Sequence, residues 1–340
     1  MIQLKILIRA DGGGNIGMGH IMRTLALAKE LKKHFDISYV CKTSGKNVED
    51  KTYGKYFKGI NKVLSSGFNI ELVRENRLFH DLGDLTGDVL ITDSYDVNDK
   101  YFSLVGDMFN KSIYIDDMCL HNFNDVDMII NQNINAEDLN YGTNAKLLLG
   151  CKYAMVRNEF KNVTAKNIKG NVYDIMITMG GTDPFFITLK LLDYLKNEHY
   201  KFHVVIGKYF DDSYIEKLKS YKNLGNIKFY YNADMCSLMK NADICISAAG
   251  STLYELCAVG VPSLSIIMAK NQIEVAKRFD SLKIIRNVGW YNKLSKQKIL
   301  AEINNLSFDY DMRRQVSIKS QKLVDGKGTF RITKEIMSIV

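Results

Sequence analysis

Short apolar segments alternate with amphipathic helical patterns along nearly all of the 340 residues. Strands that are separated by helices form parallel pairs, since the helix carries the chain back to the other end of the sheet. The sequence therefore predicts an α/β fold with doubly wound parallel sheets. The strands expected in the first half are residues 4–8, 37–41, 69–72, 89–92, 112–115 and 128–130. Those expected in the second half are residues 173–179, 202–206, 227–230, 244–247 and 263–266.

A polar stretch at residues 159–169 lies between two apolar regions and marks the expected domain boundary. A chain of this length is too long for one ordinary open sheet and fits two domains. We expect a Rossmann-like domain at residues 1–160 and a second one at residues 170–340, which ends in several helices. Because open parallel sheets bind ligands at the carboxyl ends of their strands, we expect the two domains to face a cleft.

Composition narrows the classes of function. The net charge is +8, but the lysines are scattered over helical patterns, which is typical of a solvated surface and also suits an anionic small substrate. The six cysteines form no CxxC pair and lie mostly in apolar runs, as in a reducing compartment. No apolar stretch fits a signal peptide or a membrane span. We expect a cytoplasmic protein with a small-molecule partner, and neither a nucleic-acid nor a membrane partner.

A glycine-rich loop joins the first expected strand to a helix. From Ile8 to His20 the chain reads Ile-Arg-Ala-Asp-Gly-Gly-Gly-Asn-Ile-Gly-Met-Gly-His. A glycine turn into a helix directs backbone N–H groups and the positive helix end at an anion. Gly12, Gly14 and Gly17 also fit the G-x-G-x-x-G pattern of dinucleotide-binding proteins. However, no acid ends the second expected strand to hold a ribose, and the third glycine lies too early, which disfavours a nicotinamide enzyme.

His20 stands at the start of this helix, next to whatever the loop binds. A positive helix end disfavours the imidazolium and keeps the ring able to accept a proton. The same dipole stabilises a phosphate leaving group. One interpretation is therefore a general base beside a leaving-group site. The alternative is a solvent-exposed helix residue without a role in chemistry.

The second half begins with a similar strand, glycine loop and helix. Residues 180–184 read Gly-Gly-Thr-Asp-Pro and precede a helical pattern over residues 185–195. Thr182 or Asp183 is expected to cap this helix, with Pro184 at its first position.

A third loop follows the fourth strand expected in the second half. Its small residues allow a ligand to approach the backbone, and Ser251 and Thr252 offer hydroxyls near a helix start. Glu255, one turn into the helix, can accept hydrogen bonds from two ribose hydroxyls or serve only as a first-turn acid. After the next strand, the amides of Asn271 and Gln272 can contact a sugar or simply satisfy a loop.

Two strands of the first half end in acidic residues. Asp93, Ser94 and Tyr95 follow one of them, and Asp116 and Asp117 follow the next. Adjacent acids can bind a metal, but no histidine partner pattern lies nearby. We therefore favour a substrate or structural role and expect neither a metal nor a cofactor.

Together these loops resemble the pseudaminic-acid pathway UDP-sugar hydrolases. The resemblance extends over nearly the whole chain, although residues 42–79 contribute no motif to it. The segments that carry it are residues 8–20, 93–95, 115–117, 131–133, 149–154, 157–160, 179–183, 247–255 and 270–272.

The resemblance implies the two-domain glycosyltransferase-B architecture turned to hydrolysis, related to the peptidoglycan enzyme that transfers N-acetylglucosamine to a lipid. It implies metal-independent, inverting cleavage of UDP-2,4-diacetamido-2,4,6-trideoxy-β-L-altropyranose, with His20 as the base and UDP on the C-terminal domain. The implied substrate-binding residues are Asp11, Gly17, Gly19, Arg23, Tyr95, Gly180, Gly181, Thr182, Ser251, Thr252, Glu255, Asn271 and Gln272.

The implied reaction needs few catalytic groups. UDP is already a good leaving group, so its departure needs charge stabilisation more than a strong acid. One base that directs water to the anomeric carbon is sufficient. Two alternatives stay open at this point: a glycosyltransferase of the B fold that uses a UDP-sugar donor, and a nucleotide-sugar binding protein without catalysis. The sequence leaves the oligomeric state open, as well as the choice among pseudaminic, legionaminic-type and spore-coat sugars.

Overall fold

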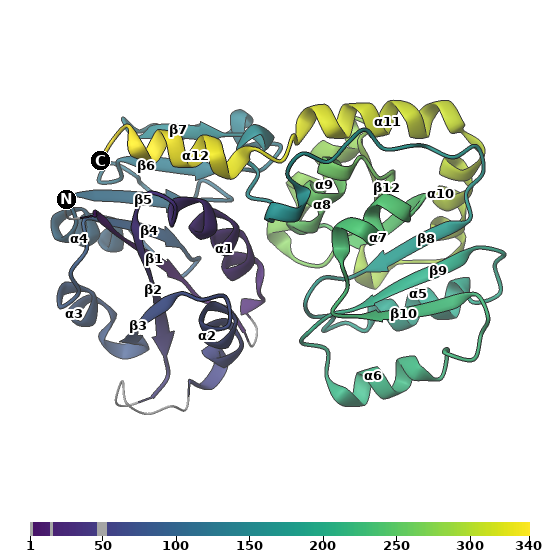
Figure 1. Cartoon of the computed structure of the whole chain (residues 1–340), viewed down its shortest axis with the longest axis horizontal. Helices are drawn as coiled ribbons and strands as arrows, with labels where there is room; N and C mark the ends of the chain where they lie inside the picture. The colour runs from purple at the N-terminus through teal and green to yellow at the C-terminus, as the bar shows by residue number, and fades with distance from the viewer. Residues whose placement is uncertain (1–2, 14–15, 46–52) are drawn as a thin grey trace. The chain divides into compact units, whose positions relative to one another are not determined.

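The computed structural model describes residues 3–13, 16–45 and 53–340. The chain divides into two compact units, one formed by Met1–Arg157 with Lys327–Val340 and the other by Asn158–Gly326 (Figure 1). Each unit is an α/β domain built on one parallel sheet, and the two sheets have 7 and 6 strands. The predicted fold class is thereby confirmed for each domain.

The sheet of the first unit has the strand order β3-β2-β1-β4-β5-β6-β7, with every neighbouring pair parallel. Six of these strands lie where the apolar runs predict them, and β7 has no counterpart among the expected strands. The strands are β1 (Lys5–Ala10), β2 (Asp36–Thr43), β3 (Asn69–Arg74), β4 (Val89–Asp93), β5 (Lys111–Ile115), β6 (Met128–Asn131) and β7 (Lys146–Leu149).

Helices cover this sheet on both sides, with α1 and α2 on one side and α3 and α4 on the other (Figure 1). The first unit contains the helices α1 (Gly19–Leu31), α2 (Phe57–Leu64), α3 (Leu78–Gly83), α4 (Asp99–Met108) and α12 (Gly328–Met337). Short 3-10 turns are η2 (Gly54–Tyr56), η3 (Glu75–Arg77), η4 (Ala136–Asp138) and η5 (Cys151–Tyr153).

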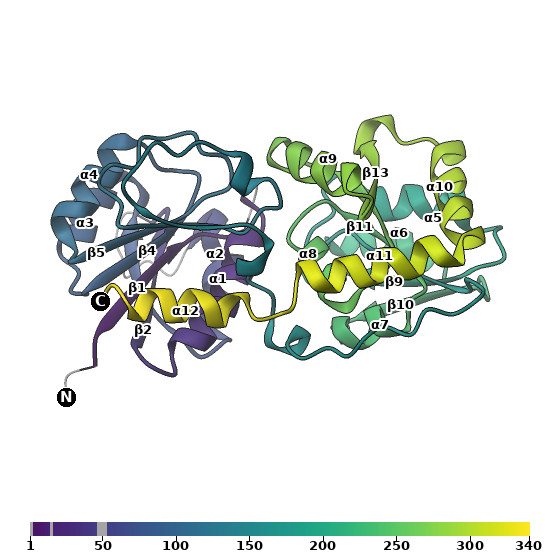
Figure 2. The same ribbon diagram turned by 90° about the horizontal axis from the view of Figure 1, so that it is seen from above.

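The last helix corrects the expected domain division. We expected residues 170–340 in the second domain, but residues 327–340 belong to the first unit. Helix α12 packs on α1 and η5. Figure 2 shows α12 beside α1. The reason is its apolar face, because Ile332 and Ile336 are both completely buried. This contact connects the end of the chain to the helix that carries His20.

The sheet of the second unit has the order β10-β9-β8-β11-β12-β13 and is also parallel throughout. Its strands are β8 (Asp174–Thr178), β9 (Lys201–Ile206), β10 (Ile227–Tyr231), β11 (Ile244–Ala248), β12 (Ser263–Ile267) and β13 (Ile285–Trp290). Its helices are α5 (Ile187–Leu195), α6 (Asp212–Lys219), α7 (Met235–Asn241), α8 (Thr252–Val259), α9 (Ile273–Ser281), α10 (Lys296–Phe308) and α11 (Tyr310–Leu323). The 3-10 turns are η6 (Asn158–Phe160), η7 (Lys270–Gln272) and η8 (Tyr291–Lys293).

Helix α5 starts later than expected. The pattern predicted a helix from residue 185 with Pro184 at its first position, but the helix begins at Ile187 and Pro184 lies in the preceding loop. The Asp183 carboxylate accepts hydrogen bonds from the backbone N–H groups of Ile187 and Thr188, at 2.9 and 2.7 Å. Asp183 therefore accepts hydrogen bonds from the first N–H groups of α5 although it lies outside the helix, and Thr182 does not cap it.

The direction of strand order reverses once in each sheet. In the first unit, β1 lies between β2 and β4, and in the second unit β8 lies between β9 and β11. The chain leaves β1 and β4 toward opposite faces of the sheet, and open α/β sheets bind ligands at such a point, beyond the carboxyl ends of the strands. The same holds for β8 and β11. The glycine loops singled out in the sequence follow β1, β8 and β11, so they lie at these two switch points.

No helix in the described part of the chain is long and apolar enough to cross a membrane.

Candidate functional site

The loop between β1 and α1 is built on tightly packed glycines. Gly13 and Gly17 both have positive φ angles, of 116° and 78°, and the Gly13 N–H donates to the Gly17 carbonyl at 2.9 Å. On one side Gly59 of α2 touches the loop, with its N–H donating to the Gly12 carbonyl at 3.1 Å. On the other side, a Cβ added to Gly17 or Gly19 would meet no atom within 4 Å. The loop is therefore supported from below and open above, although Gly14 and Asn15 lie outside the described residues.

Helix α1 presents an open N-terminus to this space. Its N-cap residue, Met18, makes no side-chain hydrogen bond to the helix. The first N–H groups of a helix need partners from outside when no side chain caps them, and an anion is a suitable partner. This is the arrangement that the glycine loop predicted.

His20 is held in one orientation by Asp93. The two lie on α1 and at the end of β4, and the distance from His20 Nδ1 to Asp93 Oδ1 is 2.6 Å. His20 is 8% exposed and Asp93 is completely buried, so the interpretation of His20 as a solvent-exposed helix residue is wrong. Burial alone would raise the pKa of the Asp93 carboxyl, but Arg23 and then His20 hold it below its ordinary value. An ionised Asp93 accepts a hydrogen bond from the Nδ1–H group of His20, so the proton stays on Nδ1 and the lone pair is on Nε2.

Arg23 connects this pair to a second carboxylate. Its Nε and Nη2 donate to the two oxygens of Asp93 at 2.7 and 2.6 Å, and its Nη1 and Nη2 donate to Asp117 at 2.7 and 3.0 Å. Although burial opposes it, Arg23 also holds the pKa of Asp117 below its usual value. Two bidentate contacts fix both carboxylates in position. Arg23 therefore lies behind His20 as part of the support of the site.

Tyr95 completes this cluster from the loop after β4. Its hydroxyl donates to Asp117 Oδ2 at 2.5 Å, and its ring lies edge-on to the His20 ring with centroids 4.6 Å apart. The Tyr95 side chain is 44% exposed, whereas the groups behind it are buried. Tyr95 therefore lies between the histidine and solvent.

Two other candidate acids of the first unit, Asp116 and Asp11, have their own hydrogen-bond donors. Asp116 accepts from the Tyr141 hydroxyl at 2.7 Å and from the Cys119 N–H at 2.7 Å, and burial raises the pKa of its carboxyl. Asp11 accepts from the Lys42 N–H at 2.8 Å, and burial raises its pKa as well. Among the described residues, the group of acids and histidine close enough to share a cation is a separate one on α3 and the loop after it: His80, Asp81 and Asp84.

The glycine loop after β8 is open on one side and closed on the other. Gly180 has a φ angle of 86°, and a Cβ added there would meet no atom within 4 Å. Below it, a Cβ added to Gly207 would lie only 2.4 Å from the Gly180 carbonyl oxygen. The Gly181 carbonyl accepts from the Tyr209 N–H at 3.0 Å. The half-buried side chain of Thr182 follows on the same loop.

The loop after β11 brings together the other candidates of the second unit. Ser251 is the N-cap of α8 and makes no capping side-chain bond, so the start of α8 at Thr252 is open like that of α1. Glu255 lies in the first turn and is 8% exposed. A Cβ added to Gly250 would lie 3.7 Å from Gln272 Nε2, so η7 contacts this loop.

Gln272 has one side-chain role within the protein and one group directed at the loop. Its Oε1 accepts from the Met268 N–H at 2.8 Å, while its Nε2 is the atom close to Gly250. Asn271 lies next to it on η7 and is half-buried. The side-chain oxygen of Gln272 therefore serves a hydrogen bond within its own loop. Its amide N–H₂ group lies beside the loop after β11.

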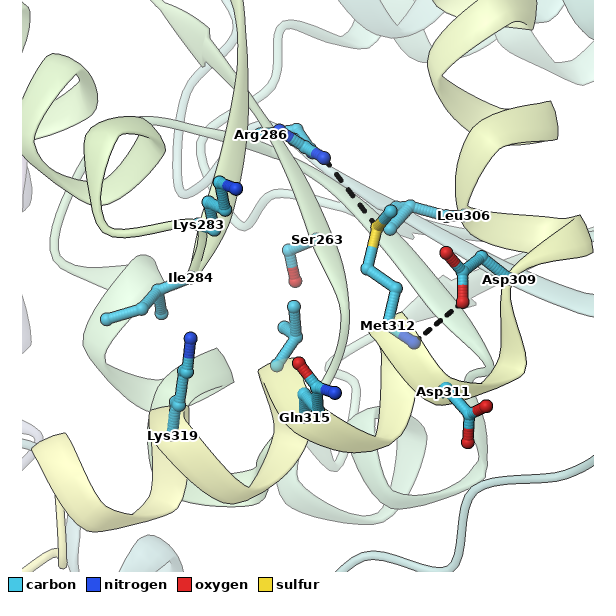
Figure 3. Close-up of a pocket in the computed structure, with 11 residues that line it drawn as sticks. Ser263, Lys283, Ile284, Arg286, Leu306, Asp309, Asp311, Met312, Gln315 and Lys319 are labelled. Carbon is cyan, nitrogen blue, oxygen red and sulfur yellow. Dashed lines mark hydrogen bonds between the residues drawn. The ribbon is translucent and has the colours of Figure 1, made fainter.

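A pocket of about 260 Å³ lies elsewhere in the second unit (Figure 3). It is lined by Ser263 at the start of β12, by Lys283 and Arg286 around the start of β13, and by Met312 of α11. These positions are at the amino ends of the strands, at the opposite edge of the sheet from the glycine loops. The pocket is therefore distinct from the glycine loops of the second unit.

Sequence patterns predict His20 but not the residues that hold it. They indicate a substrate, structural or metal-binding role for Asp93 and no role for Lys42, whereas the structure shows Asp93 bonded to His20. A signal for Asp93 existed: β1 and β4 are neighbours with Ala10 opposite Asp93, so the last residue of β4 lies beside the loop that leads into α1. The strand order that makes them neighbours cannot be read from local patterns.

Comparisons with known proteins agree with this architecture. Residues 175–327 match the glycosyltransferase family 28 C-terminal domain. The chain is 12% identical to the solved structure of MurG from Acinetobacter baumannii, with a TM-score of 0.67 and coverage of 98% of this chain and 99% of that one. It is 13% identical to the calicheamicin glycosyltransferase CalG4, with a TM-score of 0.65 over 100% and 98% of the two chains. The fold is therefore the glycosyltransferase-B fold.

Sequence relatives are closer. Uncharacterized protein MJ1062 of Methanocaldococcus jannaschii is 28% identical over 99% of this chain, which spans 66% of that relative. The UDP-2,4-diacetamido-2,4,6-trideoxy-beta-L-altropyranose hydrolase of Campylobacter jejuni is 26% identical over 80% of this chain and 95% of its own length. A Helicobacter pylori protein, named as pseudaminic acid cytidylyltransferase and the same hydrolase, is 30% identical over 65% of this chain and 43% of its own length.

Proposed function

The chain is a glycosyltransferase-B-like protein related to the pseudaminic-acid pathway UDP-sugar hydrolases, and we propose from this premise that it hydrolyses a UDP-linked sugar. One observation carries the proposal. A buried histidine, held by an ionised aspartate, lies at the open N-terminus of α1 and at the switch point of its sheet. This is the place where open α/β sheets bind ligands and where a base can reach a water molecule.

The proposed step uses His20 as the general base. Nε2 takes a proton from a water molecule, whose oxygen forms a bond to the anomeric carbon from the face opposite UDP. The bond between that carbon and the UDP oxygen breaks, and its electron pair leaves with UDP, so the configuration inverts. The imidazolium formed at His20 is stabilised by the Asp93 carboxylate, 2.6 Å from Nδ1.

The second unit is proposed to bind UDP. The open loops after β8 and β11 offer backbone N–H groups to the diphosphate, including those at the uncapped start of α8. Glu255 is proposed to hold the ribose hydroxyls, and Asn271 and Gln272 to contact the sugar. A metal ion and a cofactor are not part of the proposal.

The proposed substrate is UDP-2,4-diacetamido-2,4,6-trideoxy-β-L-altropyranose, cleaved to the free sugar and UDP in pseudaminic acid biosynthesis. Its support is the printed name of the relatives from Campylobacter and Helicobacter. We also propose a cytoplasmic location, which is supported by six cysteines that are all free thiols.

The test is incubation of the protein with this UDP-sugar alone. We expect release of free sugar and UDP, with the inverted anomer appearing first in the NMR spectrum. Turnover that requires an added acceptor would show a glycosyltransferase instead, and UDP binding without turnover would show a binding protein. A panel of UDP-diacetamido-trideoxy sugars, analysed by mass spectrometry, tests the choice of sugar.

Two variants test the assigned residues. His20→Asn is expected to lose about 10²- to 10⁴-fold in kcat and to keep its affinity for UDP, since a general base acts in the transition state. Retention of more than about a tenth of kcat would contradict the role of His20.

Glu255→Ala is expected to raise KM more than it lowers kcat, because ribose contacts are equal in the ground and transition states.

A further inference from the structure

Two buried cations of the first unit have no part in the proposed mechanism. Arg9 on β1 is completely buried, and Lys42 on β2 is 3% exposed. A charged side chain loses its hydration on burial, at a cost of several kcal/mol unless protein groups replace the water. Their partners therefore indicate what the two cations hold in place.

Both cations converge on one residue of the loop after β4. Lys42 Nζ forms an ion pair with the Asp96 carboxylate, and Arg9 Nη2 donates to the Asp96 carbonyl oxygen at 3.2 Å. The Arg9 guanidinium also lies over the ring of Tyr101, 4.7 Å from its centroid. The Asp96 side chain is 73% exposed and is paired with Lys42, whereas Arg9 holds the Asp96 backbone.

Asp96 is the neighbour of Tyr95. At its start the loop is anchored by Asp93 in the sheet, and within it the Asp96 N–H donates to Ser94 Oγ at 3.1 Å. The Tyr95 hydroxyl donates to Asp117, and its ring contacts the ring of His20. The position of Tyr95 therefore depends on a loop that is held on both sides.

Lys42 has a second carboxylate within reach. Asp11 Oδ2 lies 4.0 Å from Lys42 Nζ, and among the described residues this buried oxygen has no hydrogen-bond partner. Without Asp96, the ammonium group can move to Asp11 and still be paired. The loop would then lose its ion pair and keep only the bond from Arg9 to the Asp96 carbonyl oxygen, while the buried ammonium group stays paired.

We propose that Lys42 and Arg9 are positioning residues that hold Asp96 and thereby keep Tyr95 against His20. The proposal rests on the proposed function, because His20 is the base that Tyr95 contacts. It also gives a role to part of residues 42–79, where the sequence shows no motif.

The first test replaces the exposed partner, which leaves no cavity. Asp96→Asn is expected to lower kcat for the UDP-sugar by about 10- to 100-fold, the scale of a small misplacement in an active site. KM and the affinity for UDP should change less than about 3-fold, because the variant shifts a reacting-site contact and not UDP binding. Asp84→Asn is the matched control, since its side chain is 71% exposed and lies on another loop. It should keep the kcat of the parent protein.

A double-variant cycle tests whether the effect passes through Tyr95. In a Tyr95→Phe background, which removes the bond to Asp117, Asp96→Asn should cost less than about 2-fold in kcat, because coupled residues are not additive. Lys42→Arg should keep kcat within about 3-fold, whereas Lys42→Met should reproduce the loss of Asp96→Asn. Full additivity, or a normal kcat in Asp96→Asn, would overturn the proposal.

Amide hydrogen exchange gives a readout that does not depend on turnover. Residues 93–97 should exchange faster in Asp96→Asn than in the parent protein, and Asp84→Asn should leave them unchanged. Unchanged exchange in Asp96→Asn would show that the loop is not held by Asp96. Absence of UDP-sugar hydrolysis by the parent protein would instead overturn the proposed function, so the two failures are distinguishable.

Discussion

A histidine is an effective base when one ring nitrogen is fixed and the other keeps its lone pair. Here Asp93 fixes Nδ1 of His20, and Arg23 donates to both oxygens of Asp93. The tautomer that presents Nε2 as an acceptor is therefore set by residues that need not touch a substrate. A change at Asp93 is expected to impair catalysis through the histidine.

Asp93→Asn tests this dependence. The amide is neutral and cannot stabilise an imidazolium, so kcat is expected to fall by about 10²-fold or more, while the affinity for UDP stays unchanged. Steady-state kinetics with the UDP-sugar and calorimetry with UDP measure the two effects. Thermal denaturation checks that the buried replacement is tolerated. A kcat equal to that of the parent protein would show that the orientation of His20 does not depend on this charge.

A second residue-scale prediction concerns pH. Burial raises the pKa of Asp116 in the folded protein, so the folded state binds its proton more tightly than the unfolded state does. The parent protein therefore loses stability from this group as pH rises from the unfolded value of about 3.9 through the higher folded value. Asp116→Asn cannot titrate, so its stability relative to the parent should increase between pH 4 and pH 7. Urea unfolding at both pH values measures the difference, and a relative decrease would contradict the raised pKa.

The candidates at residue scale were predictable where they are local in sequence. His20 follows its own glycine loop, and Tyr95 follows its own strand. Their partners were not predictable, because Asp93 is 73 residues from His20 and Asp117 is 94 residues from Arg23. Only the strand order brings these side chains together.

At the scale of elements, helix α2 supports the first glycine loop by direct backbone contact. A Cβ added to Gly59 would lie 2.6 Å from the Gly12 carbonyl oxygen and 2.8 Å from the Gly12 nitrogen. Both neighbours are backbone atoms, so α2 or the loop must move to accept a larger residue. No local pattern connects α2 with the loop, since Gly59 follows Gly12 by 47 positions, with α1 and β2 between them.

Gly59→Ala is therefore expected to destabilise the protein by about 1–3 kcal/mol and to lower kcat, although alanine is the better helix former. Gly83→Ala is the matched control. It also replaces a helical glycine, but its nearest contact is at 3.7 Å, so it should be neutral or stabilise by up to about 1 kcal/mol. Urea unfolding of both variants measures the difference. Equal effects would show that α2 does not support the loop.

Element prediction succeeded where the apolar runs are continuous and buried. Strand β7 was missed because it is not a buried run, since only Leu148 of its 4 residues is buried. Strand β13, from Ile285 to Trp290, follows the last strand that the apolar runs predict in the second half. Arg286, Asn287 and Gly289 interrupt its apolar pattern, and pairing with β12 supplies the order that the pattern lacks.

At the scale of the whole molecule, the predicted two-domain organisation holds except at the end of the chain. The end of the chain was expected to form helices of the second domain, but a helical pattern does not state which partner buries it. Ile332 and Ile336 are buried in the first unit, where α12 packs on α1. The chain therefore joins the two units twice, after Arg157 and after Gly326.

The proposal places the base in the first unit and UDP on the second, and this leads to a prediction about metal ions. The proposal assigns the diphosphate to backbone N–H groups at helix starts and glycine loops, which supply the positive potential that a cation supplies in other enzymes. The acids that the sequence offered as ligands are engaged otherwise: Asp93 and Asp117 bind Arg23, and Asp116 accepts from Tyr141. A cation at these acids would have to displace a buried guanidinium. Hydrolysis should therefore proceed at the full rate in EDTA and should not increase with added magnesium or manganese. A large loss in EDTA that either metal restores would overturn the single-base mechanism and direct attention back to these three carboxylates.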